Sequence, residues 1–145
     1  MKMFNVEVKI NFDSLQQKIK ERVEFATLSL LADMKDTATD YAYPQKEEDS
    51  GYVRSGDLGS TMKIDLRWEG SYLVGRLYPT VHYAPYVEYG TGIYAVNGNG
   101  RQDKWKYQTP DGRWVTTEGM EPRLFMTKTY KQYVPIVKDY YLNLV

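Results

Sequence analysis

Hydrophobic residues near the N-terminus first follow the period of a strand and then that of a helix. Residues 4–10 alternate between apolar and polar positions, which predicts a half-buried strand whose apolar side carries Phe4, Val6, Val8 and Ile10. From Phe12 to Tyr41 the apolar residues recur at steps of three and four. This spacing predicts an amphipathic helix of about 29 residues, roughly 43 Å long.

Two β-hairpins are predicted in the second half of the chain. Residues 62–78 alternate on either side of the turn Glu69-Gly70-Ser71, and they predict the longer hairpin. Residues 105–116 predict a shorter one around Pro110-Asp111-Gly112, because Pro, Asp and Gly are favoured in tight turns. We therefore expect antiparallel pairing, since strands that are adjacent in sequence usually pair in this way.

Two further helices are marked by proline and glycine. A helical turn is predicted to begin at Pro85 and to stop at Gly90. A final helix is predicted after Pro122, which suits a first helical position, and Pro135 should kink or split it. The expected fold class is α+β: an antiparallel sheet packed against one long N-terminal helix, with a C-terminal helix and two long loops at residues 44–57 and 93–104, in one domain over residues 1–145.

Composition narrows the possible chemistry. The 145 residues carry 19 Lys and Arg against 19 Asp and Glu, with no cysteine. The lack of cysteine excludes a disulfide scaffold, a thiol nucleophile and an iron–sulfur cluster. The zero net charge argues against a whole-molecule attraction to nucleic acid or anionic membrane. Apolar stretches such as Leu28–Ala32 are far shorter than the ~20 residues of a spanning helix, so we expect no membrane partner.

The 14 tyrosines are unusual, and tyrosine is common at protein interfaces. Four of them lie in periodic elements and are expected to pack: Tyr72, Tyr78, Tyr133 and Tyr140.

Candidate catalytic and metal-binding groups are few. His82 is the single histidine, and a structural or surface role is favoured because no partner constellation accompanies it. Asp33, Asp36 and Asp40 could share a helix face and hold a cation, but a solvated face is the favoured interpretation. The glycine spacing at residues 51–56 fails as a phosphate loop because acidic Asp57 follows it. We expect neither an enzyme nor a cofactor.

Basic residues interleave with aromatic ones between Arg101 and Trp114. Such a pattern can hold single-stranded nucleic acid by stacking and cationic contacts. The alternative function is thus a single-stranded nucleic-acid-binding module that uses Trp105, Tyr107 and Trp114. The favoured interpretation is a two-stranded ribbon whose aromatic side chains face the core while its basic side chains face water.

Four segments together resemble a known family. They are Arg54-Ser-Gly-Asp-Leu-Gly-Ser60, Tyr83-Ala-Pro-Tyr-Val-Glu-Tyr-Gly-Thr-Gly92, the aromatic ribbon 105–114, and Gly119-Met-Glu-Pro-Arg-Leu-Phe-Met126. In this order they resemble the tail-completion, or neck, proteins of long-tailed phages, of the "gene product ten" type of lambdoid siphophages. The most specific part is Val87-Glu88-Tyr89-Gly90-Thr91.

This resemblance implies a structural protein of the virion that is assembled in the host cytoplasm. It implies a homo-oligomeric ring at the head–tail junction, with a hexamer favoured over a dodecamer. The implied partners are the tail tube protein, a head-side connector or stopper protein, and double-stranded DNA that passes through without sequence-specific binding. Glu88 is expected either to cap locally or to pair across subunits, and the two long loops are expected to become ordered on assembly. The expected interface residues are Tyr43, Tyr52, Arg54, Tyr86, Glu88, Tyr89, Thr91, Tyr94 and Arg101.

Overall fold

The computed structural model describes residues 7, 9, 12–44 and 56–143. The elements follow one another as α1 (Phe12–Ala42), α2 (Asp57–Ser60), β1 (Lys63–Glu69), β2 (Tyr72–Tyr78), α3 (Ala84–Tyr89), the 3₁₀-helix η1 (Gly92–Tyr94), β3 (Trp105–Gln108), β4 (Trp114–Thr117), α4 (Phe125–Tyr133) and the 3₁₀-helix η2 (Val134–Tyr140). The predicted α+β class, with one long N-terminal helix, is confirmed. None of the described helices is long and apolar enough to cross a membrane.

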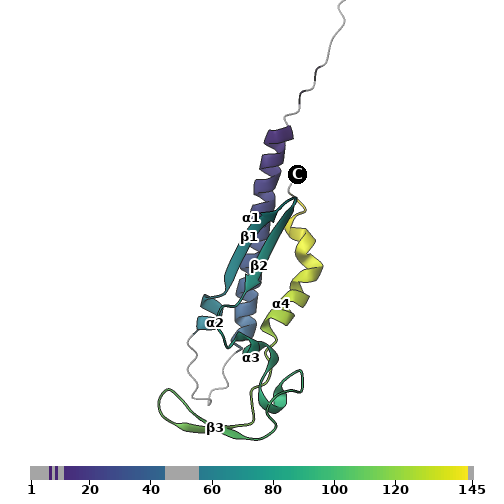
Figure 1. Ribbon diagram of the computed structural model, residues 1–145. Coiled ribbons are helices and arrows are strands. Elements are labelled where there is room, and N and C mark those ends of the chain that lie inside the picture. Colours follow the sequence, from purple (N-terminus) through teal and green to yellow (C-terminus); the bar gives the residue numbers. More distant parts are fainter. Residues whose placement is uncertain (1–6, 8, 10–11, 45–55, 144–145) are drawn as a thin grey trace, which may run out of the picture.

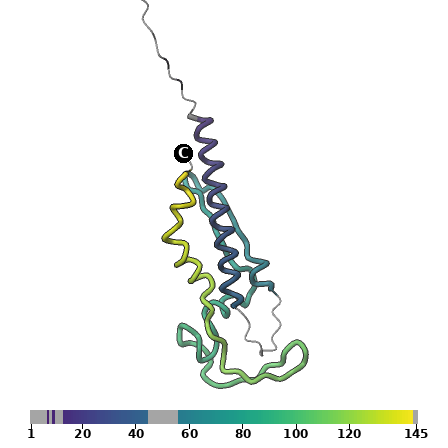
Figure 2. The backbone as a smooth tube through the Cα atoms, turned by 180° about the vertical axis from the view of Figure 1, so that it is seen from behind, coloured from purple at the N-terminus to yellow at the C-terminus, as the bar shows by residue number. Residues whose placement is uncertain are grey.

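Helix α1 is the axis of the molecule, as Figures 1 and 2 show. The β1–β2 hairpin lies along one of its sides, and α4 with η2 lies along another. The N-terminal end of α1 extends past the tip of the hairpin, whereas its C-terminal end meets α2 and α3 (Figure 1). The β3–β4 ribbon lies beyond this second end of α1.

The β1–β2 hairpin approaches α1 closely because of a glycine. Leu66 pairs with Gly75, and a Cβ atom at Gly75 would lie 2.8 Å from the Cδ1 atom of Leu31 on α1. Side chains alternate between the two faces of a strand, so Ile64 and Trp68 also lie on the face toward α1. The opposite face includes Tyr72 and Tyr78, which are both exposed. The expectation that these two tyrosines pack inside is therefore wrong.

The hydrophobic core lies where the end of α1 meets α2, α3 and the start of α4. Its largest side chain is Phe125, which is 0% exposed, and the other buried members are Ala38, Ala42, Leu58, Met62, Ala84 and Val87. Small residues on α1 let the other elements come close, so the bulky groups are supplied by Phe125 and Leu58. Four elements far apart in sequence thus share one core.

Tyrosine hydroxyls attach the C-terminal segment to α1. Tyr133 Oη lies 2.8 Å from Thr37 Oγ1, and Tyr141 Oη lies 2.8 Å from Thr27 Oγ1. Tyr140 Oη donates to the Asp33 carboxylate at 2.5 Å. Burial, together with this hydrogen bond, raises the pKa of Tyr140 to about 12. Tyr133 and Tyr140 therefore pack as predicted, and they also bond α1 through their polar ends.

Pro135 splits the C-terminal helix as predicted, since α4 ends at Tyr133 and the chain continues as η2. The start of that helix differs from the prediction: α4 begins at Phe125 rather than at Pro122. The strands that the structure describes form two separate two-stranded sheets instead of one. The strand predicted over residues 4–10 lies outside the described residues, apart from Glu7 and Lys9, which are exposed.

The predicted loops contain short ordered elements. Helix α2, at Asp57–Ser60, begins where the first predicted loop ends, and most of that loop lies outside the described residues. The second loop overlaps η1, and its Val96 N–H donates to the Tyr89 carbonyl at 2.9 Å. At least the start of the second loop is therefore fixed within the single chain.

Replacing Phe125 by alanine tests the position of the core. Phe125→Ala should lower the free energy of unfolding by about 3–5 kcal/mol, because it removes a ring that has no exposure. Phe25→Ala is the matched control, since Phe25 is 74% exposed on α1 and its loss should change stability by less than about 0.5 kcal/mol. Urea unfolding followed by circular dichroism measures both, and equal losses in the two variants would contradict this core.

Candidate functional site

Two of the four segments that carry the resemblance lie side by side. Thr91 N–H donates to the Met120 carbonyl at 2.9 Å, and Met120 N–H donates to Thr91 Oγ1 at 2.9 Å. One turn away, Arg123 N–H donates to the Val87 carbonyl at 2.9 Å. Residues 87–93 and 118–124 are thus joined backbone to backbone, although about thirty positions separate them in sequence.

Glycine makes this close approach possible. Gly92 has φ of 62°, and a Cβ atom there would overlap the carbonyl group of Glu118. Gly119 has φ of 132°, and a Cβ atom there would overlap the carbonyl group of Thr91. Both positions require glycine for conformation and for space, so the motif glycines serve the contact between the two segments.

Glu88 links the two segments from inside. It is only 5% exposed, and its carboxylate accepts hydrogen bonds from Met126 N–H at 2.8 Å and from Thr127 N–H at 3.0 Å. The Thr127 hydroxyl donates to the same carboxylate at 2.5 Å. The first N–H groups of a helix have no partner within the helix, and the helix dipole favours a negative charge there. Glu88 on α3 therefore caps the N-terminus of α4.

This cap explains why α4 begins at Phe125. Leu124, at the N-cap position, has φ of 52° and makes no side-chain capping bond. A left-handed leucine costs of order 1–3 kcal/mol unless its surroundings hold it. Leu124 N–H donates to the Glu88 carbonyl at 3.1 Å, so the same residue fixes this turn and caps the helix that follows.

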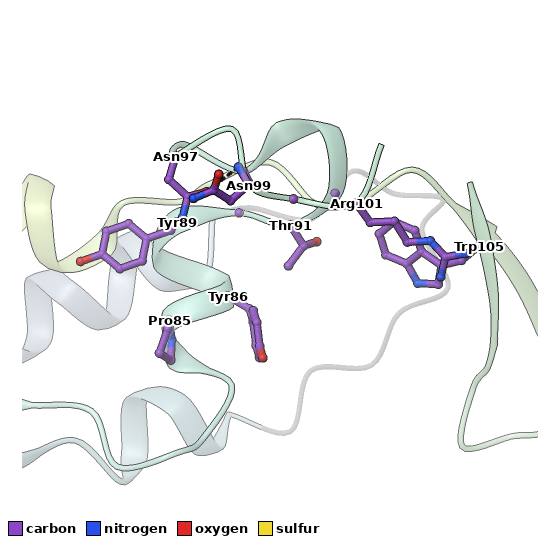
Figure 3. A pocket seen from close by; sticks show the side chains of 12 residues that line it. Pro85, Tyr86, Tyr89, Thr91, Asn97, Asn99, Arg101 and Trp105 are labelled. Carbon is purple, nitrogen blue, oxygen red and sulfur yellow. Dashed lines mark hydrogen bonds between the residues drawn. The ribbon is translucent and has the colours of Figure 1, made fainter. Parts of the chain in front are cut away.

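A pocket opens on the outer side of the contact between residues 87–93 and 118–124 (Figure 3). Its volume is about 390 Å³, and its walls come from α3, from η1 and the loop after it, and from the start of the ribbon. In Figure 3 the rings of Tyr86 and Tyr89 lie on one side of it, and Arg101 with Trp105 lies on the other. The remaining lining residues are Pro85, Gly90, Thr91, Gly92, Ala95, Asn97, Asn99 and Gly100.

The cation in this pocket already has partners. The Arg101 guanidinium lies 5.5 Å from the centre of the Trp105 ring and donates to the Asp103 carboxylate at 2.9 and 2.8 Å. This hydrogen bond lowers the pKa of Asp103. An exposed ion pair contributes little energy, whereas two tyrosine rings and a tryptophan offer a large apolar area. The pocket is thus suited to an apolar or aromatic side chain.

The structure brings together four of the nine residues predicted from sequence, since Tyr86, Tyr89, Thr91 and Arg101 all line the pocket. Tyr94 is partly exposed in the adjacent η1. Glu88 points inward, so the geometry supports the local-capping alternative for this residue. Tyr43 accepts a hydrogen bond from Gly59 N–H at 3.0 Å and thereby holds α2. Tyr52 and Arg54 lie outside the described residues.

The sequence did not indicate how the ribbon divides its aromatic residues. Trp105 pairs with Thr117, and Tyr107 pairs with Val115, so these residues share one face. Trp114 pairs with Gln108 on the opposite face. A single strand of nucleic acid could not stack on Trp105, Tyr107 and Trp114 from one side. This arrangement argues against nucleic-acid binding by these three residues together, and against a ribbon whose aromatic side chains all face the core.

The other candidate catalytic and metal-binding residues, His82 and Asp33, contact neighbouring side chains of the fold. The His82 ring is exposed and meets the Tyr83 ring edge-on, with 5.6 Å between centroids. Asp33 is the acceptor for Tyr140, as described above. Among the described residues, no three His, Asp or Glu side chains are arranged to hold a metal ion.

Comparison of the chain with family models, with curated proteins and with solved structures finds no match. A function must therefore be argued from the motif residues, their contacts and the surfaces they create.

Glu88→Gln tests the cap. The amide keeps one acceptor oxygen but turns an NH₂ group toward backbone donors, so unfolding should become easier by about 1–3 kcal/mol. The amide hydrogens of Met126 and Thr127 should exchange faster with solvent, which hydrogen exchange measures directly. Glu121→Gln, at an exposed acid before α4, is the control and should leave exchange unchanged. Unaltered protection in Glu88→Gln would show that another group caps α4.

Proposed function

We propose that this chain is the subunit of a ring at the head–tail junction of a long-tailed phage, where it completes the tail and allows the tail to join a DNA-filled head. One observation carries the proposal: the most specific motif segment, residues 87–91, is joined to the segment 119–126 through Glu88, and this arrangement leaves Tyr86 and Tyr89 exposed. These residues are 59% and 54% exposed. A motif that builds a rigid aromatic surface is expected of an assembly protein, because aromatic residues anchor interfaces.

The distribution of exposed apolar groups supports a subunit that contacts neighbours through different surfaces. The pocket lies at the α3 end, whereas Phe25 and Leu28 are exposed on α1, although the same helix buries Ala26 and Leu31. Ring subunits need two unlike surfaces that fit each other, and successive contacts close by rotation. A single chain with separated apolar regions meets this requirement.

The remaining partners follow from the position in the virion. One side of the ring would contact the tail tube protein, and the other would contact a head-side connector or stopper protein. A hexamer is favoured over a dodecamer. Zero net charge suits a passage for double-stranded DNA, because a strongly basic lumen would retain the phosphate backbone.

Removing the two exposed tyrosines tests the assembly surface. Tyr86→Ala with Tyr89→Ala should raise the concentration needed for ring formation at least tenfold, because loss of interface aromatics costs more than ~1 kcal/mol each where they are buried by a partner. Native mass spectrometry measures the oligomer, and a melting curve checks the fold. Tyr130→Ala is the control, since Tyr130 is exposed on α4 outside the pocket. Unchanged assembly in the double variant would remove the pocket from the interface.

Deletion of the gene tests the role itself. The expected result is filled heads and separate tails in the electron microscope, with joining restored by the purified protein. Normal joined virions after deletion would contradict the proposed function.

A further inference from the structure

A second groove lies at the other end of α1, between the helix and the tip of the β1–β2 hairpin. Its volume is about 510 Å³, and Leu15, Ile19 and Lys20 face Trp68 and Gly70 across it. Leu15 and Ile19 are 46% and 39% exposed. These apolar residues therefore line an open groove rather than a packed contact.

The aromatic wall of this groove is held in place. Trp68 Nε1–H donates to the Glu24 carboxylate at 2.6 Å, and the Lys20 ammonium lies 5.3 Å from the centre of the tryptophan ring. Two residues of α1 thus fix the Trp68 ring beside Ile19. A fixed, partly exposed ring beside aliphatic side chains favours an apolar occupant.

The hairpin beside the groove has open edges. Within the described part of the chain, β1 and β2 pair only with each other. Each outer edge therefore offers backbone N–H and C=O groups to a further strand. Sheets usually need three or more strands for independent stability, so an added strand would be favourable.

The sequence just before α1 has the alternating pattern of a strand. Residues 4–10 alternate, with Phe4, Val6, Val8 and Ile10 on the apolar side. On the polar side, Lys9 Nζ lies 3.3 Å from Glu7 Oε1, and both side chains are exposed. The polar side of this segment therefore carries exposed charges of both signs.

We propose that residues 4–10 of one copy bind to the β1 edge of a second copy and cover its groove. The occupant is another copy because the N-terminal end of α1, which directly follows residues 4–10 in sequence, extends past the tip of its own hairpin (Figure 1). The described residues Glu7 and Lys9 are also exposed instead of lying on their own β1. Seven extended residues span roughly 23 Å, which matches the seven residues of β1.

Antiparallel pairing of residues 4–10 with β1 places charged residues opposite charged residues on the outer face and apolar residues opposite apolar residues on the inner face. With Glu7 opposite Arg67, Lys9 falls opposite Asp65, so unlike charges meet on the outer face. On the inner face the same register sets Val6 opposite Trp68 and Val8 opposite Leu66. Parallel pairing is the orientation that a fold-back onto the chain's own β1 would require, and it is the weaker arrangement per residue.

This inference adds a specific contact to the proposed ring, and it rests on the proposed function in one respect: copies of the chain must associate. The donor segment and the acceptor groove are different surfaces, so each copy gives a strand to one neighbour and takes a strand from the other. Contacts of this kind propagate head to tail and close into a ring when the rotation allows it.

Mixing two defective chains tests donation between copies. Val6→Asp with Val8→Asp places charges on the apolar side of the donor segment and leaves the groove intact. Ile19→Asp places a charge in the groove and leaves the donor segment intact. Each variant alone should need at least tenfold more protein to associate than wild type, while their mixture should give heterodimers in native mass spectrometry. Asn5→Asp adds charge on the polar side and is the control, which should assemble normally.

Cysteine cross-linking tests the register of this pairing. The chain has no cysteine of its own, so only the introduced cysteines can form a disulfide. Oxidised Lys9→Cys with Asp65→Cys should give covalent dimers and longer ladders on a non-reducing gel. An intramolecular disulfide in Lys9→Cys with Glu69→Cys, the parallel pairing, would overturn donation to a neighbour. Wild-type assembly that Val6→Asp with Val8→Asp leaves unaltered would overturn the inference alone. A wild-type chain that stays monomeric at every concentration would overturn the ring as well.

Discussion

The hydrogen bonds of the Glu88 carboxylate decide how the elements at the α3 end of the molecule are arranged. A carboxylate buried without partners would be very costly, but this one receives two backbone N–H groups and a hydroxyl at a helix N-terminus. The cap sets the start of α4, and Phe125, the first residue of α4, then fills the core beside Val87. Because α3 turns Val87 and Glu88 inward, Tyr86 and Tyr89 are turned outward. Stability and surface therefore come from opposite sides of the same short helix.

Tyrosine has two roles in this chain, and the polar end of the ring explains both. Along α4 and η2, Tyr133 is buried and Tyr140 is half-buried, and their hydroxyls bond to Thr37 and Asp33 of α1. The long helix can therefore stay polar over much of its length and still hold a C-terminal segment. At α3 the same amphipathic side chain is left exposed, where its polar end keeps an exposed ring compatible with water. Tyrosine can thus serve both inside the fold and on its surface.

Sequence reasoning succeeded where local chemistry decides the structure. The length of α1, the turn at Gly70 and the break at Pro135 all follow from periodicity or from single turn residues. It failed where a distant residue decides. The start of α4 depends on Glu88, more than thirty positions earlier, and no local signal marks Leu124 as left-handed.

The site was only partly predicted, because long-range structure also decides which residues join it. The motif pointed to Tyr86, Tyr89 and Thr91, but Trp105 joins their pocket only through the path of the chain after η1. The separation of Trp105 from Trp114 depends on strand register, which the length of the turn determines. Tyr72 was misplaced because periodicity identifies two faces without saying which one α1 covers.

The two surfaces proposed for assembly lie at opposite ends of α1, and this separation has a mechanical consequence. The groove lies near Ile19, and the core beneath the α3 pocket reaches Ala42, so roughly 35 Å of helix separates them. A contact at one end alone would leave neighbouring subunits free to pivot. Contacts at both ends would fix the angle between successive subunits, and that angle decides whether a head-to-tail chain closes into a ring or grows into a filament. If both proposed contacts form, the length of α1 would therefore set ring size, independent of the chemistry at either end.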